Sequence, residues 1–354
     1  MWIDNSIFKE DMEFVATCES VGWENLENAT VLVTGATGLI GSTIVSSLIY
    51  ADRKKNLNLK VIALVRDLEK AKMQFASQIS FSNSLSFVEG TVEDLPCITG
   101  DIDYIIHGAS PTASAFFVEH PVETINIAVQ GTTNLLNLAV KKAVKGFVYL
   151  SSMEVYGAPQ TDDLILESQG TTIDTMSVRS SYPEAKRLCE CLCASYASQY
   201  GVCATVVRLA QTFGPGVDVN DKRVFAEFAR CAMYKQDIVL QTAGTSKRCY
   251  LYTADAATAI LTVLTRGEIG NAYNAANPDT YCSIVEMANM VVRELANGEI
   301  QVYLPIDGKH DNKFPPPHSL NLGIEKAHCL GWKPKTGHLE MYRRMLNSNS
   351  GIFK

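Results

Sequence analysis

The stretch "TGATGLIG", residues 34–41, places three glycines in the pattern G-x-x-G-x-x-G. It follows the apolar run "ATVLV" and precedes "STIVSSLIY", which together predict a buried strand, a tight turn and a helix. Glycine permits a close backbone approach to a pyrophosphate, and a helix N-terminus offers unpaired N–H groups to it. The stretch therefore predicts dinucleotide binding in this strand–turn–helix context. The predicted cofactor-binding residues of the turn are Gly35, Thr37, Gly38, Leu39, Ile40 and Gly41.

Short strands rich in Val, Ile and Leu alternate with helical stretches as far as about residue 213. This alternation predicts an α/β fold with a Rossmann-like, doubly wound parallel sheet. Residues 1–28 are interpreted as a helical lead-in and 29–213 as the dinucleotide-binding domain. Residues 214–345 are expected to form mainly a smaller substrate-binding lobe, with a return to the sheet around 251–277. The six expected strands lie in "ATVLVTG", "LKVIALVRD", "LSFVEGTVEDL", "DIDYIIHGAS", "KGFVYLSSMEVYG" and "VCATVVRLAQTFGPG".

The charge and cysteine pattern exclude several classes of protein. The 354 residues carry a net charge of -7, which argues against a nucleic-acid partner. No apolar run has membrane-spanning length and no signal-peptide pattern is present, so a cytoplasmic location without a membrane partner is expected. The ten cysteines and six histidines have no metal-ligand spacing, so no metal site is predicted.

The second expected strand ends in Arg66 and Asp67. A carboxylate at this position would bind the ribose hydroxyls of NAD, whereas an arginine suits the additional phosphate of NADP. Arg66 occupies the place where the carboxylate is expected, and Asp67 follows it. The cofactor is therefore predicted to be NAD or NADP, with NADP favoured.

Tyr182 and Lys186 stand four residues apart in "YPEAK", so on a helix they lie one turn apart on the same face. A lysine ammonium beside a phenol favours the phenolate and is expected to lower the pKa of the tyrosine. Ser152, at the end of the fifth strand, is placed to hydrogen-bond the same reacting oxygen. These three residues predict an acid–base centre next to the cofactor.

These motifs resemble those of extended short-chain dehydrogenases/reductases of the NAD-dependent nucleotide-sugar epimerase/dehydratase family. The resemblance covers about residues 29–332 and also rests on "HGASP", "SSMEVYG", "RLAQTFGPG", "KRCYLYTAD" and "LGWKP". The local motifs are most similar to those of UDP-glucuronate decarboxylases. The resemblance implies that Ala109, Ser110 and Asn126 lie at the cofactor, and that Ser110 and Pro111 contact the substrate.

The resemblance also implies one opening reaction. Tyr182 takes the proton of a sugar 4-hydroxyl while the nicotinamide accepts the C4 hydride, which gives a bound 4-keto sugar. Lys186 holds the cofactor ribose, and Ser152 orients the hydroxyl. Epimerisation, loss of water or loss of carbon dioxide can follow, and in most of these the cofactor stays tightly bound and is recycled.

Glu154 and Met153 discriminate between these outcomes. In the family, dehydratases carry an Asp-Glu pair and decarboxylases a Ser-Glu pair, whereas simple 4-epimerases have a small or hydroxyl residue in place of the glutamate. Here the partner of Glu154 is Met153, which neither ionises nor donates a proton. Glu154 is therefore expected to act alone at C5, as a base or a polar clamp. The alternative is that it only caps the following turn.

The substrate diphosphate is expected to need local cations in this acidic protein. By resemblance, Arg248 and Arg223 bind it, and Arg248 can equally hold a C6 carboxylate. Gln211 stands where the family has an asparagine and is also expected to bind substrate. His107 is expected to be packed beside the cofactor cleft rather than catalytic. Thr91 replaces the aspartate that usually approaches the adenine.

The leading prediction is a nucleotide-diphosphate-sugar epimerase that acts through transient C4 oxidation. A UDP-glucuronate decarboxylase-like enzyme is second, a 4,6-dehydratase third and an NADPH-dependent 4-keto-sugar reductase fourth. A non-catalytic dinucleotide sensor is disfavoured, because a sensor has no need of Ser152, Tyr182 and Lys186 together. By resemblance, the chain is expected to form a homodimer through the helices that contain Asn126 and Tyr182.

Overall fold

The computed structural model describes residues 5–112, 114–170, 172–305 and 317–348. Its α-helices (α), 3-10 helices (η) and strands (β) are, in chain order, α1 Ser6–Ala16, η1 Trp23–Leu26, β1 Thr30–Thr34, α2 Leu39–Lys55, β2 Lys60–Val65, α3 Leu68–Gln74, α4 Ala76–Phe81, β3 Leu85–Glu89, β4 Tyr104–His107, α5 Ser114–Glu119, α6 Pro121–Lys142, β5 Gly146–Ser152, η2 Met153–Tyr156, η3 Val178–Ser180, α7 Ser181–Tyr200, β6 Ala204–Leu209, β7 Gln211–Phe213, α8 Val224–Tyr234, β8 Ile238–Val239, β9 Lys247–Tyr252, α9 Thr253–Arg266, β10 Ala272–Ala275, β11 Asn277–Ser283, α10 Ile284–Glu294, β12 Val302–Tyr303, β13 Ser319–Leu320, α11 Glu325–Cys329 and α12 His338–Ser348.

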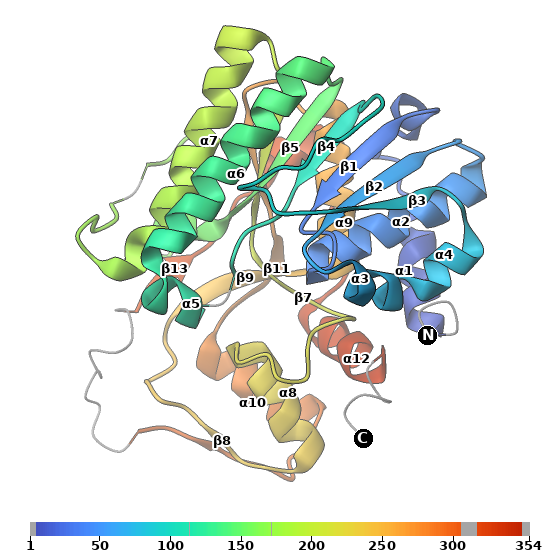
Figure 1. The fold of residues 1–354 in the computed structure, drawn as a ribbon. Coiled ribbons are helices and arrows are strands. Elements are labelled where there is room, and N and C mark those ends of the chain that lie inside the picture. The colour runs from blue at the N-terminus through green and yellow to red at the C-terminus, as the bar shows by residue number, and fades with distance from the viewer. Residues whose placement is uncertain (1–4, 113, 171, 306–316, 349–354) are drawn as a thin grey trace.

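The central sheet has seven strands in the order β10-β6-β5-β4-β1-β2-β3, and every neighbouring pair is parallel (Figure 1). The predicted Rossmann-like class is confirmed. The strand order reverses between β1 and β4, so the loops after these two strands diverge. In open parallel sheets such a reversal creates the crevice in which ligands bind. The edge strand β10 comes from beyond residue 213 and pairs with β6.

Helices cover both faces of this sheet, with α6 and α7 on one face and α2 and α9 on the other (Figure 1). The two faces of a strand carry alternate residues. Accordingly, Val31 and Val33 of β1 lie in one hydrophobic cluster, while Leu32 between them lies in the other. Burial on both faces explains why these strands read as continuous apolar runs in the sequence.

The segment that reads as one sixth strand in the sequence is two strands in different sheets. β6 belongs to the central sheet, whereas β7 pairs with β9 in a second sheet. Ala210 lies between them and still donates its backbone N–H to the carbonyl of Ala275 at 2.9 Å. The chain therefore changes sheets after Ala210, and no glycine or proline in the sequence marks the change.

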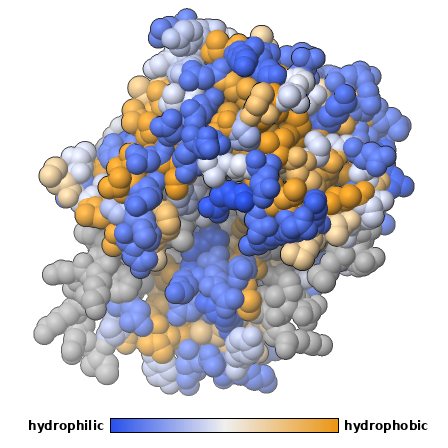
Figure 2. Space-filling model, in the orientation of Figure 1, coloured by the Kyte–Doolittle hydropathy of each residue, from blue (hydrophilic) through white to orange (hydrophobic). Residues whose placement is uncertain are grey.

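The second sheet contains β7, β9, β11 and β13, and the pair β8 and β12 lies apart from it next to α8 and α10 (Figure 1). These elements form a smaller lobe against the central sheet. Hydrophilic residues are prominent where the two parts meet on the face shown in Figure 2. The boundaries at residues 28 and 213 stay predictions.

The described part of the chain has no helix that is both long and apolar enough to cross a membrane. The same residues contain no cluster of three or more His, Cys, Asp or Glu side chains that could hold a metal ion. All ten cysteines are free thiols.

Candidate active site

The glycine turn lies between β1 and α2, at the edge of the sheet where the strand order reverses. Gly35 has a φ of +67°, and a Cβ there would lie 2.7 Å from the carbonyl carbon and oxygen of Gly108. A Cβ on Gly41 would overlap the carbonyl oxygen of Gly35. Both positions therefore need glycine for the turn to pack against the end of β4. Gly38 differs, since its nearest contact among the described atoms is the Gly35 oxygen at 3.3 Å.

The N-terminus of α2 has the properties of a phosphate-binding site. Gly38 is its N-cap, and none of the described side chains caps it. The first N–H groups of the helix are therefore available to an anion, and the helix dipole favours negative charge there. Gly38 is exposed, so its missing side chain leaves room above these N–H groups. This arrangement fits the diphosphate of a nicotinamide dinucleotide.

At the end of β2, Arg66 and Asp67 are both exposed. The Asp67 carboxylate accepts a hydrogen bond from the Lys70 backbone N–H at 2.9 Å and so caps α3. Because the carboxylate is engaged in this cap, Arg66 is the freer of the two to meet a cofactor ribose or phosphate.

The end of β5 and the start of α7 bring Ser152, Tyr182 and Lys186 together. The Ser152 hydroxyl is near enough to the Tyr182 phenol to lower its pKa. The Lys186 ammonium lies 5.6 Å from the centre of the Tyr182 ring and donates to the carbonyl of Leu150 at 2.7 Å. Tyr182 also stacks on Phe117 of α5, with ring centres 4.2 Å apart and planes 5° from parallel. The structure thus assembles the three predicted residues around one phenol.

The protonation of this centre differs from the expectation drawn from residue spacing. Burial, followed by the Glu154 carboxylate, raises the pKa of Tyr182, whereas the Ser152 hydroxyl lowers it. Burial also lowers the pKa of Lys186 to about 8. The Lys186 ammonium donates its hydrogen bond to the Leu150 carbonyl and not to the phenol. The expected lowering of the Tyr182 pKa is therefore wrong for the protein without ligands. The phenol is stored in its protonated form.

Glu154 lies in η2, two residues after Ser152, and its backbone N–H donates to the Ser152 hydroxyl at 3.2 Å. Burial raises the pKa of its carboxyl group, while the charges of Arg179 and Arg248 lower it. Its neighbour Met153 is only 3% exposed and belongs to a hydrophobic cluster. The charges of two guanidinium groups therefore act on the carboxyl group, while the thioether is buried.

Arg248 of β9 carries unused hydrogen-bonding capacity. Its Nε is buried without a hydrogen-bond partner among the described residues, and its Nη2 lies 3.5 Å from Nε2 of His318. A buried guanidinium N–H without a partner is costly, which indicates a place for an anionic or polar ligand. Arg223, in contrast, already forms a bidentate ion pair with Asp221, with a shortest distance of 2.5 Å.

The comparison with known proteins identifies the family of this fold and site. The model of the NAD dependent epimerase/dehydratase family matches residues 31–276. The chain belongs to this epimerase/dehydratase family. It is 30% identical over 309 residues to UDP-glucuronic acid decarboxylase 5 of Arabidopsis thaliana, which covers 87% of this chain and 85% of the relative. It is 28% identical over 321 residues to dTDP-D-glucose 4,6-dehydratase of Mus musculus, at 86% and 84% coverage.

Solved structures agree on the epimerase/dehydratase fold. UDP-N-acetylglucosamine 4-epimerase from Methanobrevibacter ruminantium superposes with a TM-score of 0.78 and 20% identity, covering 92% of this chain and 99% of that one. UDP-glucose 4-epimerase from Thermus thermophilus, in complex with NAD, gives 0.72 and 22%, with coverage of 91% and 99%. At these identities the likeness shows the fold alone.

Several other residues that we predicted to bind cofactor or substrate lie near the ends of β1, β4 and β6. The Ala109 N–H donates to the Thr34 hydroxyl at 3.2 Å, which places the loop after β4 beside the glycine turn. Ser110 and Pro111 continue this loop and are half-buried. Gln211 is half-buried at the start of β7, opposite Tyr250 of β9. Their contacts to cofactor or substrate stay predictions.

Asn126 and His107 have different surroundings from these residues. Asn126 is exposed on α6, and its contact with the cofactor stays a prediction. His107 is buried between the hydroxyls of Thr34 and Thr132, at 2.8 Å and 3.1 Å, and burial lowers its pKa to about 3. His107 is therefore a neutral, packed residue beside the glycine turn, with a hydrogen bond at each ring nitrogen. Its hydrogen bond to Thr34 supports that turn.

Sequence reasoning missed three residues of this site. Arg179, whose charge acts on Glu154, stands one helical turn before Tyr182, and that spacing was a usable signal. Phe117 and His318 carry no such signal. They come from segments 65 residues before and 136 residues after Tyr182 in the sequence, and only the fold brings them to Tyr182 and Arg248.

Proposed function

We propose that the protein modifies a nucleotide-diphosphate sugar by transient oxidation at C4. The observation that carries this proposal is the position of Lys186, which lies 5.6 Å from the centre of the Tyr182 ring next to the strand that ends in Ser152, beside a turn that fits a dinucleotide diphosphate. The family membership and the names of the relatives support the substrate class.

Each residue has a role that follows from its position. A bound nicotinamide dinucleotide supplies a hydride acceptor and donor at C4. Ser152 orients the sugar 4-hydroxyl toward Tyr182, and Tyr182 receives the hydroxyl proton after passing its own to solvent or cofactor hydroxyls. Lys186, with a pKa of about 8, changes charge near neutral pH and supports this proton transfer. The Arg248 guanidinium binds an anionic group of the substrate.

Epimerisation is the reaction that we favour for the resulting 4-keto sugar. Met153 is buried in the core, so η2 offers the sugar one ionisable group, Glu154, and not a pair. Dehydration needs a second group to protonate the departing hydroxyl, which a methionine cannot do. Glu154 alone suffices to hold or exchange a proton at C5, which the ketone acidifies.

Decarboxylation of a uronate is the second candidate, for a separate reason. The charges of Arg179 and Arg248 both act on Glu154, so two cations are available on this side of the site for the C6 carboxylate of a uronate. The 30% identity to a UDP-glucuronic acid decarboxylase supports the same reading.

Mass spectrometry of products tests these candidates. The protein is incubated with UDP-glucuronate, UDP-glucose, UDP-N-acetylglucosamine and dTDP-glucose, with and without NAD or NADP, in H₂O and in D₂O. In H₂O, unchanged mass with a shifted chromatographic peak supports epimerisation. In D₂O, deuterium at C5 that disappears in Glu154→Gln assigns the exchange to Glu154. Loss of carbon dioxide supports decarboxylation instead. Turnover of none of these sugars would contradict the proposal.

The cofactor preference is a separate proposal, that NADP binds better than NAD. Arg66 is exposed at the end of β2, and Asp67 is engaged in capping α3. We expect Arg66→Ala to weaken NADP binding about tenfold while NAD binding changes less than about twofold, because one charge-assisted contact to the phosphate is lost. Titration calorimetry with both cofactors measures this. Equal losses for NAD and NADP would contradict the assignment.

We also propose a homodimer through the outer faces of α6 and α7, and a cytoplasmic location. Apolar side chains are exposed on both helices, among them Val122, Ile125 and Leu188 at 63%, 41% and 47%. A second copy would cover them. Light scattering should give twice the mass of the chain, and Leu188→Asp should shift it to the monomer. A monomer at micromolar concentration in the unmodified protein would refute the dimer.

A further inference from the structure

Behind the catalytic residues lies a buried polar cluster, which we call the Arg208 network. Arg208 of β6 forms a bidentate ion pair with Glu190 of α7, with distances of 3.0 Å and 2.6 Å. Its Nη1 also donates to the Tyr156 hydroxyl at 2.8 Å. Ser151 donates to the same Glu190 carboxylate at 2.5 Å, and Tyr156 donates to Asn274 of β10 at 2.7 Å. The network therefore consists of Ser151, Tyr156, Glu190, Arg208 and Asn274.

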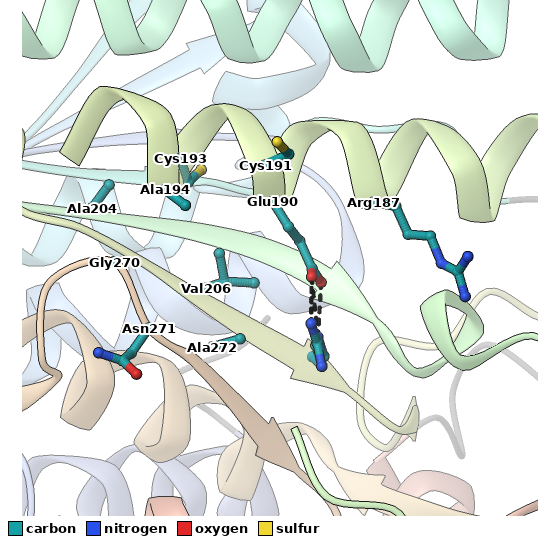
Figure 3. Close-up of a pocket in the computed structure, with 11 residues that line it drawn as sticks. Arg187, Glu190, Cys191, Cys193, Ala194, Ala204, Val206, Gly270, Asn271 and Ala272 are labelled. Carbon is teal, nitrogen blue, oxygen red and sulfur yellow. Dashed lines mark hydrogen bonds and ion pairs between the residues drawn. The ribbon is translucent and has the colours of Figure 1, made fainter. Parts of the chain in front are cut away.

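Two members of the network belong to the elements that carry the catalytic side chains. Glu190 stands four residues after Lys186 and eight after Tyr182, so all three share one face of α7. Figure 3 shows Glu190 projecting from α7 toward the strands, with dashed lines at its ion pair. Tyr156 stands two residues after Glu154 in η2. Arg208 thus holds the helix of Tyr182 and the turn of Glu154 at the same time.

Burial and hydrogen-bond geometry favour a single arrangement of the Arg208 network. The side chains of Arg208 and Glu190 are only 14% and 12% exposed, so their charges are weakly screened and the planar fork of the guanidinium fixes their geometry. Asn274 anchors the far side by donating to the carbonyls of Ile165 and Gly323 at 3.1 Å and 2.9 Å. Each polar atom that moves would lose a buried partner.

A second cluster in the molecule has the same chemistry but lies elsewhere. Arg344 donates to the Tyr252 hydroxyl at 3.0 Å and pairs with Asp11 at 2.9 Å. Tyr252 and Tyr156 are both 1% exposed. The Arg344 cluster joins α1, α12 and the end of β9, and its hydrogen bonds among the described residues do not reach η2 or α7. It is therefore a matched control for the cost of removing a buried tyrosine hydroxyl beside an arginine.

We propose that the Arg208 network is a positioning device, which sets the placement of Glu154 relative to Tyr182 and Lys186. This inference deepens the proposed function and rests on it for its kinetic consequence. A direct link supports it, because the Glu190 charge acts on Lys186 and opposes the effect of burial on the pKa of that lysine. A hydrogen bond outside the network also joins α7 to η2. Arg187 of α7 donates to the carbonyl of Val155, next to Glu154, at 2.8 Å.

The test compares Tyr156→Phe with Tyr252→Phe in the full-length protein saturated with cofactor. Tyr156→Phe breaks the hydrogen bonds from η2 to Arg208 and Asn274, so we expect η2 to loosen and the Glu154 carboxyl to become more accessible to water. We expect its raised pKa to fall toward the ordinary value of 4.5 in Tyr156→Phe and to stay unchanged in Tyr252→Phe. Titration by ¹³C NMR of labelled glutamate, with the signal assigned by its loss in Glu154→Gln, measures this without any substrate.

Kinetics with the nucleotide sugar that the unmodified protein converts provide the second readout. We expect kcat to fall about tenfold or more in Tyr156→Phe with little change in KM, because misplacement of a catalytic group affects the transition state more than ground-state binding. Tyr252→Phe should keep kcat within about twofold. A general loss of stability would instead affect both variants alike.

The outcomes separate the two proposals. If the Glu154 pKa is the same in Tyr156→Phe and Tyr252→Phe, the inference is overturned, whatever their kcat values. If the Glu154 pKa shifts only in Tyr156→Phe but both variants keep the same kcat, the inference is also overturned. If the unmodified protein converts no nucleotide sugar, the proposed function fails, and the titration still decides whether the network places Glu154.

Discussion

Tyr182 shows how the environment of one side chain sets its chemistry. The spacing to Lys186 alone suggests a tyrosine that ionises easily. In the folded protein, burial against Phe117 and the nearby Glu154 carboxylate raise the pKa of Tyr182, and the Ser152 hydroxyl only partly offsets this. The phenol is therefore protonated near neutral pH in the protein without ligands.

Replacement of Tyr182 by phenylalanine tests this role. We expect Tyr182→Phe to reduce turnover about 10²- to 10⁴-fold, which is the range for loss of an acid–base catalyst. Its cofactor affinity and melting temperature should stay near those of the unmodified protein, since the ring still stacks on Phe117. Steady-state kinetics and calorimetry measure these quantities. Tyr196→Phe on the same helix, which loses a hydrogen bond to Asn137, is the control and should keep full activity. Retained activity in Tyr182→Phe would remove the assignment.

Among the elements, the turn between β1 and α2 combines two kinds of glycine. Gly35 and Gly41 are required by packing, because a Cβ at either would meet backbone atoms. Among the described atoms, a Cβ at Gly38 would meet only the Gly35 carbonyl oxygen, at a tight 3.3 Å, and it would lie above the uncapped N-terminus of α2. One turn therefore uses glycine for two purposes, which are closure of the backbone and access for a ligand.

Alanine substitutions should separate these purposes. We expect Gly41→Ala to destabilise the protein by at least about 2 kcal/mol, because its Cβ overlaps the Gly35 carbonyl. Gly38→Ala should change stability by no more than about 1 kcal/mol, because its Cβ only crowds the Gly35 oxygen, and should weaken cofactor binding at least about tenfold, since its Cβ obstructs the diphosphate. Urea unfolding and fluorescence titration with NADH or NADPH measure both effects. Gly337→Ala, which meets nothing within 4 Å, is the control. Unchanged cofactor affinity in Gly38→Ala would refute this view of the site.

Across the whole molecule, the Arg344 cluster joins the two ends of the described chain to the smaller sheet. Asp11 of α1 accepts hydrogen bonds from Tyr252 of β9 and Arg344 of α12. Burial nevertheless raises the pKa of Asp11 from 3.8 to about 6. Between these values the unfolded chain loses this proton before the folded chain does, so stability falls as pH rises through the window.

Asp11→Asn should remove this pH dependence. Relative to the unmodified protein, we expect the variant to gain about 2 kcal/mol of unfolding free energy between pH 4.5 and pH 7, because one pKa unit corresponds to about 1.4 kcal/mol. Urea unfolding at both pH values measures the difference. Asp162→Asn is the control, since the pKa of Asp162 is lowered to about 2 and its titration lies below this window. A constant difference between Asp11→Asn and the unmodified protein would show that Asp11 is ionised throughout.

The fold class and part of the site were predictable because they depend on local patterns. Alternating apolar runs specify strands and helices, the glycine spacing specifies a turn, and the Tyr182 to Lys186 spacing specifies one helix face. Each of these signals lies within a few neighbouring residues. The change of sheet at Ala210 left no such signal, since the strands on both sides of it follow each other without a turn residue between them.

What depended on the tertiary structure is the environment of each group. Met153 is buried, and the pKa of Tyr182 is raised where its spacing to Lys186 predicted a lowering. The charges of Arg179 and Arg248 act on Glu154. All three effects arise from segments that are separated in the chain. The same is true of Arg208, which joins α7 to η2. Electrostatic and desolvation energies depend on distance in space and on access of water, and neither quantity is encoded by the spacing of residues along a sequence.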